Sequence, residues 1–162
     1  MTRVYVSIGS NVEREYNVRS ALVALRARYA PLTVSPIYET GAVGFDGADF
    51  LNLVVGFDTH LDPATLTAEF KALEDAHGRE RGGHGGISPR TLDLDLLTWG
   101  DTAYDDGRVR LPRSEIVDCA FVLRPLADIA GDEPHPTLGR PYAELWAAFD
   151  ASGQPMRRIE LD

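Results

Sequence analysis

Three stretches of the chain alternate apolar and polar positions, as strands with one buried face do. Residues 4–8 form the first stretch and residues 91–99 the last. In residues 50–58, four apolar side chains are expected to point one way: Leu51, Leu53, Val55 and Phe57. Residues 33–38 are expected to form a further strand, which Pro36 would place partly at an edge or a bulge. The pattern therefore predicts four strands.

Two other segments place apolar residues three or four positions apart, as an amphipathic helix does. In residues 13–29 this stripe consists of Val18, Leu22, Leu25 and Tyr29. The second helix is expected to start at Asp62 and Pro63, an N-cap followed by proline at the first helical position, and to end at Gly78. Its stripe consists of Leu66, Phe70, Leu73 and His77.

The predicted order is strand, helix, strand, strand, helix, strand. This is the order of a ferredoxin-like βαββαβ core, an α+β fold with an antiparallel sheet and helices on one face. Beyond the core, residues 108–111 are expected to form a short edge strand, and residues 121–129 and 141–149 two helices. The glycine-rich residues 40–49 and 79–89 are expected to be loops. The 162 residues are expected to form one domain, 1–162.

Composition narrows the class of protein further. Apolar residues make up 44% of the chain and charged residues 25%, as in a folded soluble protein, and no apolar run approaches the roughly 20 residues that span a bilayer. We expect no membrane partner, a cytoplasmic location and a monomer. The net charge of −9 argues against a nucleic-acid partner. Cys119 is the only cysteine and is expected to be a small buried residue, since no intrachain disulfide is possible.

A pair of aspartates is the first candidate for a metal-binding or catalytic site. Along a strand, Thr91, Asp93 and Asp95 share one face, whereas three leucines share the other. Two adjacent carboxylates repel each other unless a positive charge lies between them, and Mg²⁺ binds such pairs together with substrate phosphates. Asp-x-Asp alone, however, is more often a solvated strand face.

Arginines near this pair favour a phosphate ligand. Of the 16 basic residues all but Lys71 are arginine, and Arg79, Arg81 and Arg90 flank a glycine-rich loop before the aspartates. Arginine forks and Mg²⁺ together neutralise a transferring phosphoryl group. The combination indicates a nucleoside triphosphate site, although the chain contains no Walker or protein-kinase signature.

Three further polar or aromatic features have two interpretations each. The Asn52 amide could hydrogen-bond a heteroaromatic ring, and Phe50 or Phe121 could stack on it. Alternatively, Asn52 only completes a strand end and both phenylalanines belong to the core. Glu74, read in isolation, is a solvated helix charge.

Pro89-Arg-Thr-Leu-Asp-Leu-Asp95 resembles the signature of the 6-hydroxymethyl-7,8-dihydropterin pyrophosphokinase family. The resemblance extends to Gly9-Ser-Asn11, Phe50-Leu-Asn52, Glu74 with Gly78-Arg79, and Phe121-Val-Leu with Pro125-Leu126. It implies a three-layer α/β/α sandwich around the ferredoxin-like core. It also implies transfer of diphosphate from ATP to the hydroxymethyl group of a reduced pterin in folate biosynthesis, with AMP leaving.

The resemblance also implies roles for individual residues. Asp93 and Asp95 would hold two Mg²⁺ ions, and Arg79 and Arg90 would contact the phosphates during catalysis. The residues expected near ATP are Glu74, Arg81, Leu96, Arg108, Arg110 and Arg113. The residues expected around the pterin are Thr40, Gly41, Val43, Phe50, Asn52 and Phe121.

The chain departs from the family pattern in its substrate loops. Ile87 and Ser88 replace the usual Trp and Gly, and Arg113 and Cys119 replace a His and an Arg. Phe50 replaces a common Tyr. Losing one aromatic stack is expected to weaken pterin binding several-fold, because such a stack contributes about 0.5–1.5 kcal/mol.

Two rival functions remain at this point. One is a catalytically weak or silent relative that only binds pterin or nucleotide. The other is a two-metal nucleotidyltransferase, which would usually require a third carboxylate on a neighbouring strand.

Overall fold

The computed structural model describes residues 1–41, 49–78 and 92–161. The strands are β1 (Thr2–Ser10), β2 (Thr33–Val34), β3 (Ile37–Thr40), β4 (Phe50–Thr59), β5 (Asp93–Trp99), β6 (Tyr104–Asp105), β7 (Arg110–Leu111) and β8 (Met156–Ile159). The helices are α1 (Arg14–Tyr29), α2 (Pro63–Ala76), α3 (Glu115–Asp118), α4 (Ala120–Ala130) and α5 (Tyr142–Ala147).

The main sheet is antiparallel, with the strand order β5-β1-β4-β3-β8. The first four of these strands have the connectivity of the expected ferredoxin-like core, and β8 extends the sheet beyond β3. On the central strand β1, Ser7 lies opposite Asp95, and Gly9 lies opposite both Asp93 and Asn52. The register therefore places Asp93 and Asp95 of β5 and Asn52 of β4 on either side of Ser7 and Gly9 of β1.

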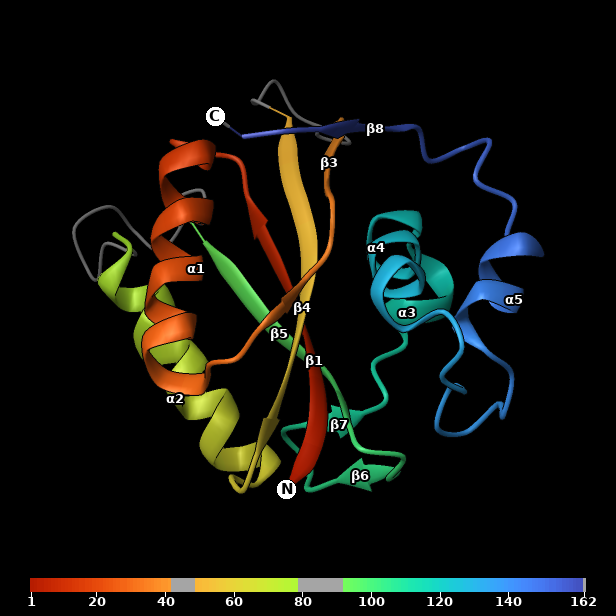
Figure 1. Ribbon diagram of the computed structural model, residues 1–162, viewed down its shortest axis with the longest axis horizontal. Helices are drawn as coiled ribbons and strands as arrows, with labels where there is room; N and C mark the ends of the chain where they lie inside the picture. The colour runs from red at the N-terminus through yellow and green to blue at the C-terminus, as the bar shows by residue number, and fades with distance from the viewer. Residues whose placement is uncertain (42–48, 79–91, 162) are drawn as a thin grey trace.

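Helices cover both faces of the sheet (Figure 1). On the α1 and α2 face, the four apolar residues expected from β4 pack with Leu94 and Leu96 of β5. On the other face, Val54 and Leu97 pack with residues of α4 and with Tyr142 of α5. The α+β fold is confirmed. The order of the elements predicted helices on one face of the sheet only, and this is wrong. The three-layer sandwich implied by the family resemblance is what the structure shows.

Local sequence signals explain the ends of α2. The Asp62 carboxylate accepts a hydrogen bond from the Thr65 amide at 2.7 Å, and Pro63 occupies the first turn. Gly78 follows the helix with φ at 93°, a left-handed conformation that glycine adopts without strain. Both expected boundaries are confirmed within two residues.

The strand expected at 33–38 is divided in two. Ser35 and Pro36 separate β2 from β3, because proline cannot donate to the ladder. The Ser35 hydroxyl instead accepts a hydrogen bond from the Val54 amide at 2.8 Å, which ties the break to β4.

Several short elements were not predicted. Residues 108–111 were expected to form one edge strand, but only Arg110–Leu111 is extended, and it pairs with β6 in a separate hairpin. The helix α3 and the edge strand β8 were missed. β8 contains two exposed arginines and shows no alternation of buried and exposed positions. Much of the two expected loops, residues 42–48 and 79–91, lies outside the described residues.

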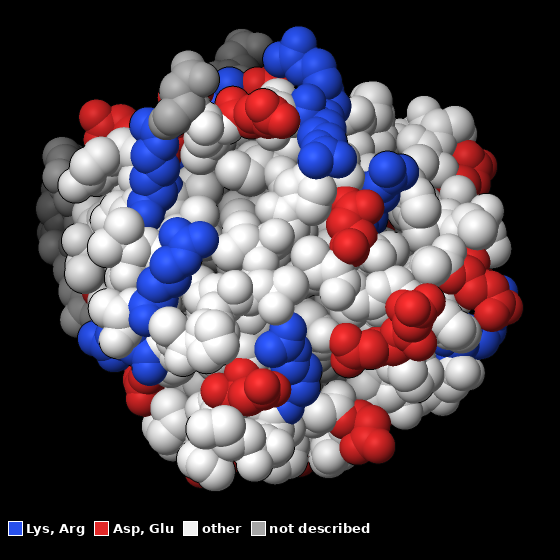
Figure 2. All heavy atoms as spheres, viewed as in Figure 1, with Lys and Arg blue, Asp and Glu red and all other residues white. Residues whose placement is uncertain are grey.

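The described surface mixes both signs of charge. Figure 2 shows separate basic and acidic patches on one face, with basic side chains along α1, whose exposed arginines include Arg19, Arg26 and Arg28. Among the described residues, no helix is both long and apolar enough to cross a membrane.

Candidate functional site

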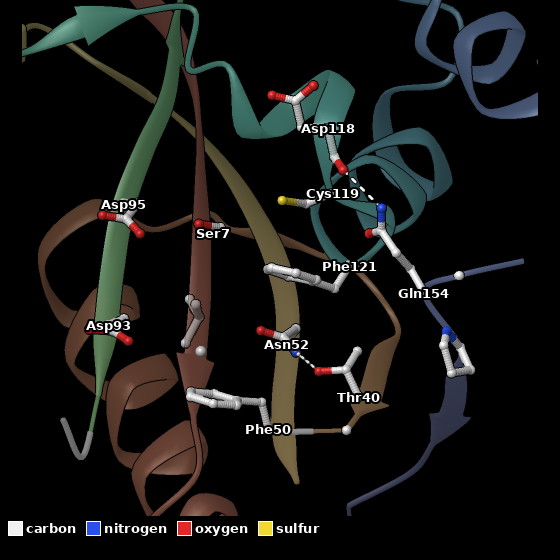
Figure 3. Close-up of a pocket in the computed structure, with 15 residues that line it drawn as sticks. Ser7, Thr40, Phe50, Asn52, Asp93, Asp95, Asp118, Cys119, Phe121 and Gln154 are labelled. Carbon is white, nitrogen blue, oxygen red and sulfur yellow. Dashed lines mark hydrogen bonds between the residues drawn. The ribbon is translucent and has the colours of Figure 1, made fainter. Parts of the chain in front are cut away.

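A cavity of about 670 Å³ lies on the sheet face that also carries α3 and α4. Strands β1, β3, β4 and β5 line it on one side, and the α3–α4 junction and the segment before β8 line it on the other (Figure 3). The lining residues are Ser7, Ile8, Gly9, Thr40, Gly41, Phe50, Asn52, Asp93, Asp95, Asp118, Cys119, Phe121, Gly153, Gln154 and Pro155.

Asp93 and Asp95 both face this cavity from β5, whereas Leu92, Leu94 and Leu96 are buried against the helices on the opposite face. The predicted alternation is therefore confirmed. Ser7 of β1 lies opposite Asp95 in the sheet, so its hydroxyl is on the same face as that carboxylate. Figure 3 shows both aspartates at one wall of the cavity.

Gly9 forms a part of the cavity floor that has no side chain, between Asp93 and Asn52. It pairs with Asp93 on one side and with Asn52 on the other. A Cβ atom at this position would lie 3.2 Å from the Asn52 Oδ1 atom and 4.0 Å from the Phe50 ring. Because glycine has no side chain, a planar ligand can lie against the backbone here.

Asn52 is held in one orientation and is 7% exposed. Its Nδ2 group donates to the Thr40 hydroxyl at 2.8 Å, and its Oδ1 atom lies beside the Gly9 floor. This hydrogen bond links β4 to the end of β3 inside the cavity (Figure 3). Asn52 therefore ties two strand ends together and also lines the cavity, and its contact with a ligand stays a prediction.

The two phenylalanines line the cavity. Phe121, in the first turn of α4, is 36% exposed, and Phe50, at the start of β4, is half-buried. Neither contributes to the buried core clusters. The alternative that both belong to the core is wrong, since both rings are available to a ligand in the cavity.

The interpretation of Glu74 as a solvated charge is also wrong. It is 8% exposed, and its Oε2 atom accepts a hydrogen bond from the Leu94 amide at 2.8 Å. Leu94 lies between the two aspartates, so Glu74 anchors the strand that presents them. Helix periodicity missed this role, since Glu74 directly follows Leu73 and lies beside the buried stripe of α2.

Arg113 is the basic residue that the structure places nearest to the aspartate pair among those described. Its Nη1 atom is 3.9 Å from the Asp95 carboxylate, and its Nε atom donates to Glu115 at 2.5 Å. Burial favours the neutral form of Glu115, but the hydrogen bond and charge of Arg113 outweigh this and hold the pKa of Glu115 below its ordinary value.

None of the five described residues expected near ATP is among the cavity-lining residues, and three of them also lie away from the aspartate pair. Arg108 and Arg110 are exposed on the β6–β7 hairpin, where Arg110 pairs with Asp105 at 3.1 Å. Leu96 is buried in the core under α1 and α2. Their contacts with a nucleotide stay predictions.

The remaining expected residues lie outside the described residues. These are Val43, Arg79, Arg81 and Arg90, together with the altered positions Ile87 and Ser88. Their roles in binding also stay predictions.

Cys119 is half-buried rather than fully buried as expected, and it lies at the cavity wall and packs against the core cluster around α4. Burial raises the pKa of its thiol, and the Glu115 and Asp118 carboxylates add to the rise. These surroundings therefore favour the neutral thiol over the thiolate. Only the family resemblance had drawn attention to this position, because the family usually has an Arg there.

Sequence reasoning missed several lining residues. Ser7 could have been found, because the ferredoxin-like strand order places β1 beside β5 and alternation puts Ser7 on the cavity face. Asp118, Gly153, Gln154 and Pro155 gave no local signal, since they reach the cavity only through the packing of α3 and β8.

The aspartate pair fits a hard divalent cation. Mg²⁺ takes oxygen ligands and is usually bound by one or two carboxylates, with water and phosphate oxygens completing the octahedron. Asp93 and Asp95 are half-buried carboxylates facing the same cavity. Among the described residues, no group of three acidic, His or Cys side chains could hold a metal.

Comparison with known proteins gives a consistent result. Residues 5–131 match the family model described as 7,8-dihydro-6-hydroxymethylpterin-pyrophosphokinase (HPPK). The 2-amino-4-hydroxy-6-hydroxymethyldihydropteridine pyrophosphokinase of Pseudomonas aeruginosa is 39% identical over 155 residues, which are 93% of this chain and 94% of that protein. The protein of the same name from Bacillus subtilis is 39% identical over 130 residues, covering 77% of this chain and 76% of that protein.

Solved structures show the same fold. Wild-type HPPK-DHPS of Plasmodium falciparum superposes with a TM-score of 0.72 at 12% identity, and 91% of this chain is covered. The chain spans 44% of the length of that solved protein. With the family match and the two bacterial relatives, the chain belongs to the 7,8-dihydro-6-hydroxymethylpterin-pyrophosphokinase family.

Proposed function

We propose that this protein transfers the terminal diphosphate of ATP to the hydroxymethyl group of 6-hydroxymethyl-7,8-dihydropterin, with Mg²⁺ held by Asp93 and Asp95. One observation carries the proposal: the two carboxylates share a cavity with an aromatic and amide site suited to a pterin ring. The names of the bacterial relatives support this substrate and this reaction.

The pterin ring would lie over Gly9, where the backbone offers a flat surface. Asn52 Oδ1 can accept a hydrogen bond from an amino or ring N–H group at the edge of the pterin, since its Nδ2 group is already directed to Thr40. Phe50 and Phe121 provide aromatic faces in the same cavity. This placement directs the hydroxymethyl end toward β5.

Asp93 and Asp95 would hold the cation between themselves and the phosphates. Mg²⁺, when bound there, neutralises charge on the polyphosphate as the reaction proceeds. Arg113 is close enough to Asp95 to turn from that carboxylate to a phosphate oxygen. Glu74 keeps the strand backbone between the aspartates in place through Leu94.

The chemistry is an in-line displacement without a covalent enzyme intermediate. The pterin hydroxyl oxygen forms a bond to the β-phosphorus, and the bond from that phosphorus to the oxygen bridging it to the α-phosphorus breaks. AMP leaves, and the hydroxyl proton is released. The chain contributes by positioning the two substrates and by electrostatic stabilisation.

Other features belong to the same proposal. The number of Mg²⁺ ions, two, and the phosphate contacts of Arg79, Arg81 and Arg90 come from the resemblance. We further propose that residues 1–162 form one domain, because β8 pairs with β3 and α5 packs on α4, and that this domain works as a monomer.

A phosphorus NMR assay with MgATP and the reduced hydroxymethyl pterin tests the reaction. The proposal predicts AMP together with a pterin diphosphate. ADP would indicate an ordinary kinase, free pyrophosphate a nucleotidyltransferase, and no turnover a silent binding protein. Each of these three results contradicts the proposal.

A further inference from the structure

The α3–α4 junction, which carries Phe121, is a break of one residue. Cys119 ends α3 and precedes α4 with φ at −122° and ψ at 118°, an extended conformation. Such a break leaves carbonyl groups at the end of one helix and amide groups at the start of the next without helical partners. Something else must satisfy them.

The local sequence does not supply a cap. The side chain of Cys119, at the N-cap position of α4, makes no capping hydrogen bond. Pro125 lies inside α4 and has no N–H group to donate to the carbonyl of Phe121, so the first turn has one helical hydrogen bond fewer. The Val122 and Leu123 amides still donate to the Cys119 carbonyl, but the Ala120 amide and the Asp118 carbonyl at the break need partners from elsewhere.

Gln154 supplies both missing partners from a segment that is distant in sequence. Its Oε1 atom accepts a hydrogen bond from the Ala120 amide at 2.8 Å, and its Nε2 group donates to the Asp118 carbonyl at 3.0 Å. The two contacts lie on either side of Cys119, and Figure 3 shows the one to the Asp118 carbonyl. One side-chain amide thus bridges the break.

The segment that carries Gln154 is tied to the pterin side of the cavity. Met156 of β8 pairs with Thr40 of β3 in the backbone ladder, a contact that does not depend on the side chains of β8. Gly153, Gln154 and Pro155 themselves line the cavity. The position of α4 relative to Thr40 and Asn52 is therefore coupled to β8 through Gln154.

We propose that Gln154 is a positioning residue that caps α4 and sets the place of the Phe121 ring over the pterin site. The inference deepens the proposed function and rests on it. Gln154 lies beyond residues 5–131, the part of the chain that matches the family model. The inference concerns affinity for the pterin, because Gln154 contacts the turn that carries Phe121, whereas Asp93 and Asp95 lie on β5 at the other wall of the cavity.

The test measures steady-state rates for the wild-type protein and three variants, with pterin and MgATP varied in turn. Gln154→Ala should raise KM for the pterin about tenfold, since two hydrogen bonds that order the junction are lost, while kcat and the KM for ATP change by less than about twofold. Arg157→Ala, which removes the ion pair of Arg157 with Glu39 without touching α4, should leave all three constants near wild type. Gln154→Glu keeps the acceptor for Ala120 and should fall between wild type and Gln154→Ala.

A second readout does not depend on turnover. Amide hydrogen exchange at Ala120 should be faster in Gln154→Ala than in wild type and near wild type in Gln154→Glu and Arg157→Ala. An unchanged pterin KM in Gln154→Ala, a loss confined to kcat, or an equal rise in Arg157→Ala would overturn the inference while leaving the proposed function intact. A wild-type protein without pterin turnover would instead refute the proposed function, whatever Ala120 exchange shows.

Discussion

Replacing Gly9 with Ala should separate pterin binding from stability. The added Cβ atom would lie 3.2 Å from Asn52 Oδ1 and 4.0 Å from the Phe50 ring. The first of these contacts is tight, so the Asn52 side chain must shift by a few tenths of an ångström. The backbone of Gly9 is not in the left-handed region, and alanine is therefore allowed there.

Two opposing effects keep the change in stability small. Glycine weakens a strand interior by roughly 0.5–1 kcal/mol relative to alanine, and the tight contact with Asn52 costs a similar amount. We expect the free energy of unfolding to change by less than about 1 kcal/mol in urea titrations.

Pterin affinity should fall much further. The new methyl group rises about 1.5 Å from the backbone into the place of the ring, which would lift the ring from the floor and away from Asn52. Losing one or two hydrogen bonds of about 0.5–1.5 kcal/mol each raises Kd by roughly 3- to 150-fold. Calorimetry with the pterin in the presence of a non-hydrolysable MgATP analogue measures this change.

Gly153→Ala is the matched control. Gly153 lines the same cavity, but a Cβ atom there would meet no other atom within 4 Å. Its pterin affinity should stay near wild type. If Gly9→Ala bound the pterin as tightly as wild type, the ring could not lie over Gly9, and the assignment of the cavity floor would be refuted.

Three further predictions concern other parts of the site and the core. Leu94→Asp places a charge on the buried face of β5, where Leu94 is 5% exposed, and should lower the free energy of unfolding by at least about 3 kcal/mol in urea titrations; an equally stable variant would show that the strand faces are reversed. Arg113→Ala should raise KM for ATP several-fold with less effect on the pterin KM, and an unchanged ATP KM in initial-rate assays would exclude a phosphate contact. Burial, with the Glu133 carboxylate adding to it, raises the pKa of Tyr5 to about 12, above the unfolded value of about 10. The neutral Tyr5 side chain therefore contributes its full stabilisation of the fold below pH 10, and this contribution is lost as pH rises toward 12. Tyr5→Phe should make the free energy of unfolding less dependent on pH between 10 and 12, and an unchanged pH dependence would contradict the assignment.

The fold was largely predictable because its signals are local. The alternation of β4 separates Leu51, Leu53, Val55 and Phe57 from Asn52, and the structure keeps this division across the sheet. Asp62 and Gly78 set the ends of α2 through backbone chemistry that needs no distant partner. β8 was missed because an exposed edge strand buries too little to need an apolar pattern.

The site was predictable only in part, because several of its residues act through distant partners. Asp93 and Asp95 could be placed on one face from alternation alone. Glu74 was misread because its partner, the Leu94 amide, is a backbone group that the sequence does not reveal. Gln154 gave no signal, since its role depends on the break at Cys119 and on the pairing of β8 with β3.

The central claim is that Asp93 and Asp95 hold Mg²⁺ against the polyphosphate during diphosphate transfer. The most direct test is the rate of AMP formation by Asp95→Asn, a change that keeps the size of a half-buried side chain and removes its charge. The account predicts a loss of several orders of magnitude in kcat, with a circular dichroism spectrum like that of wild type. Turnover within tenfold of wild type would contradict the metal site and the mechanism built on it.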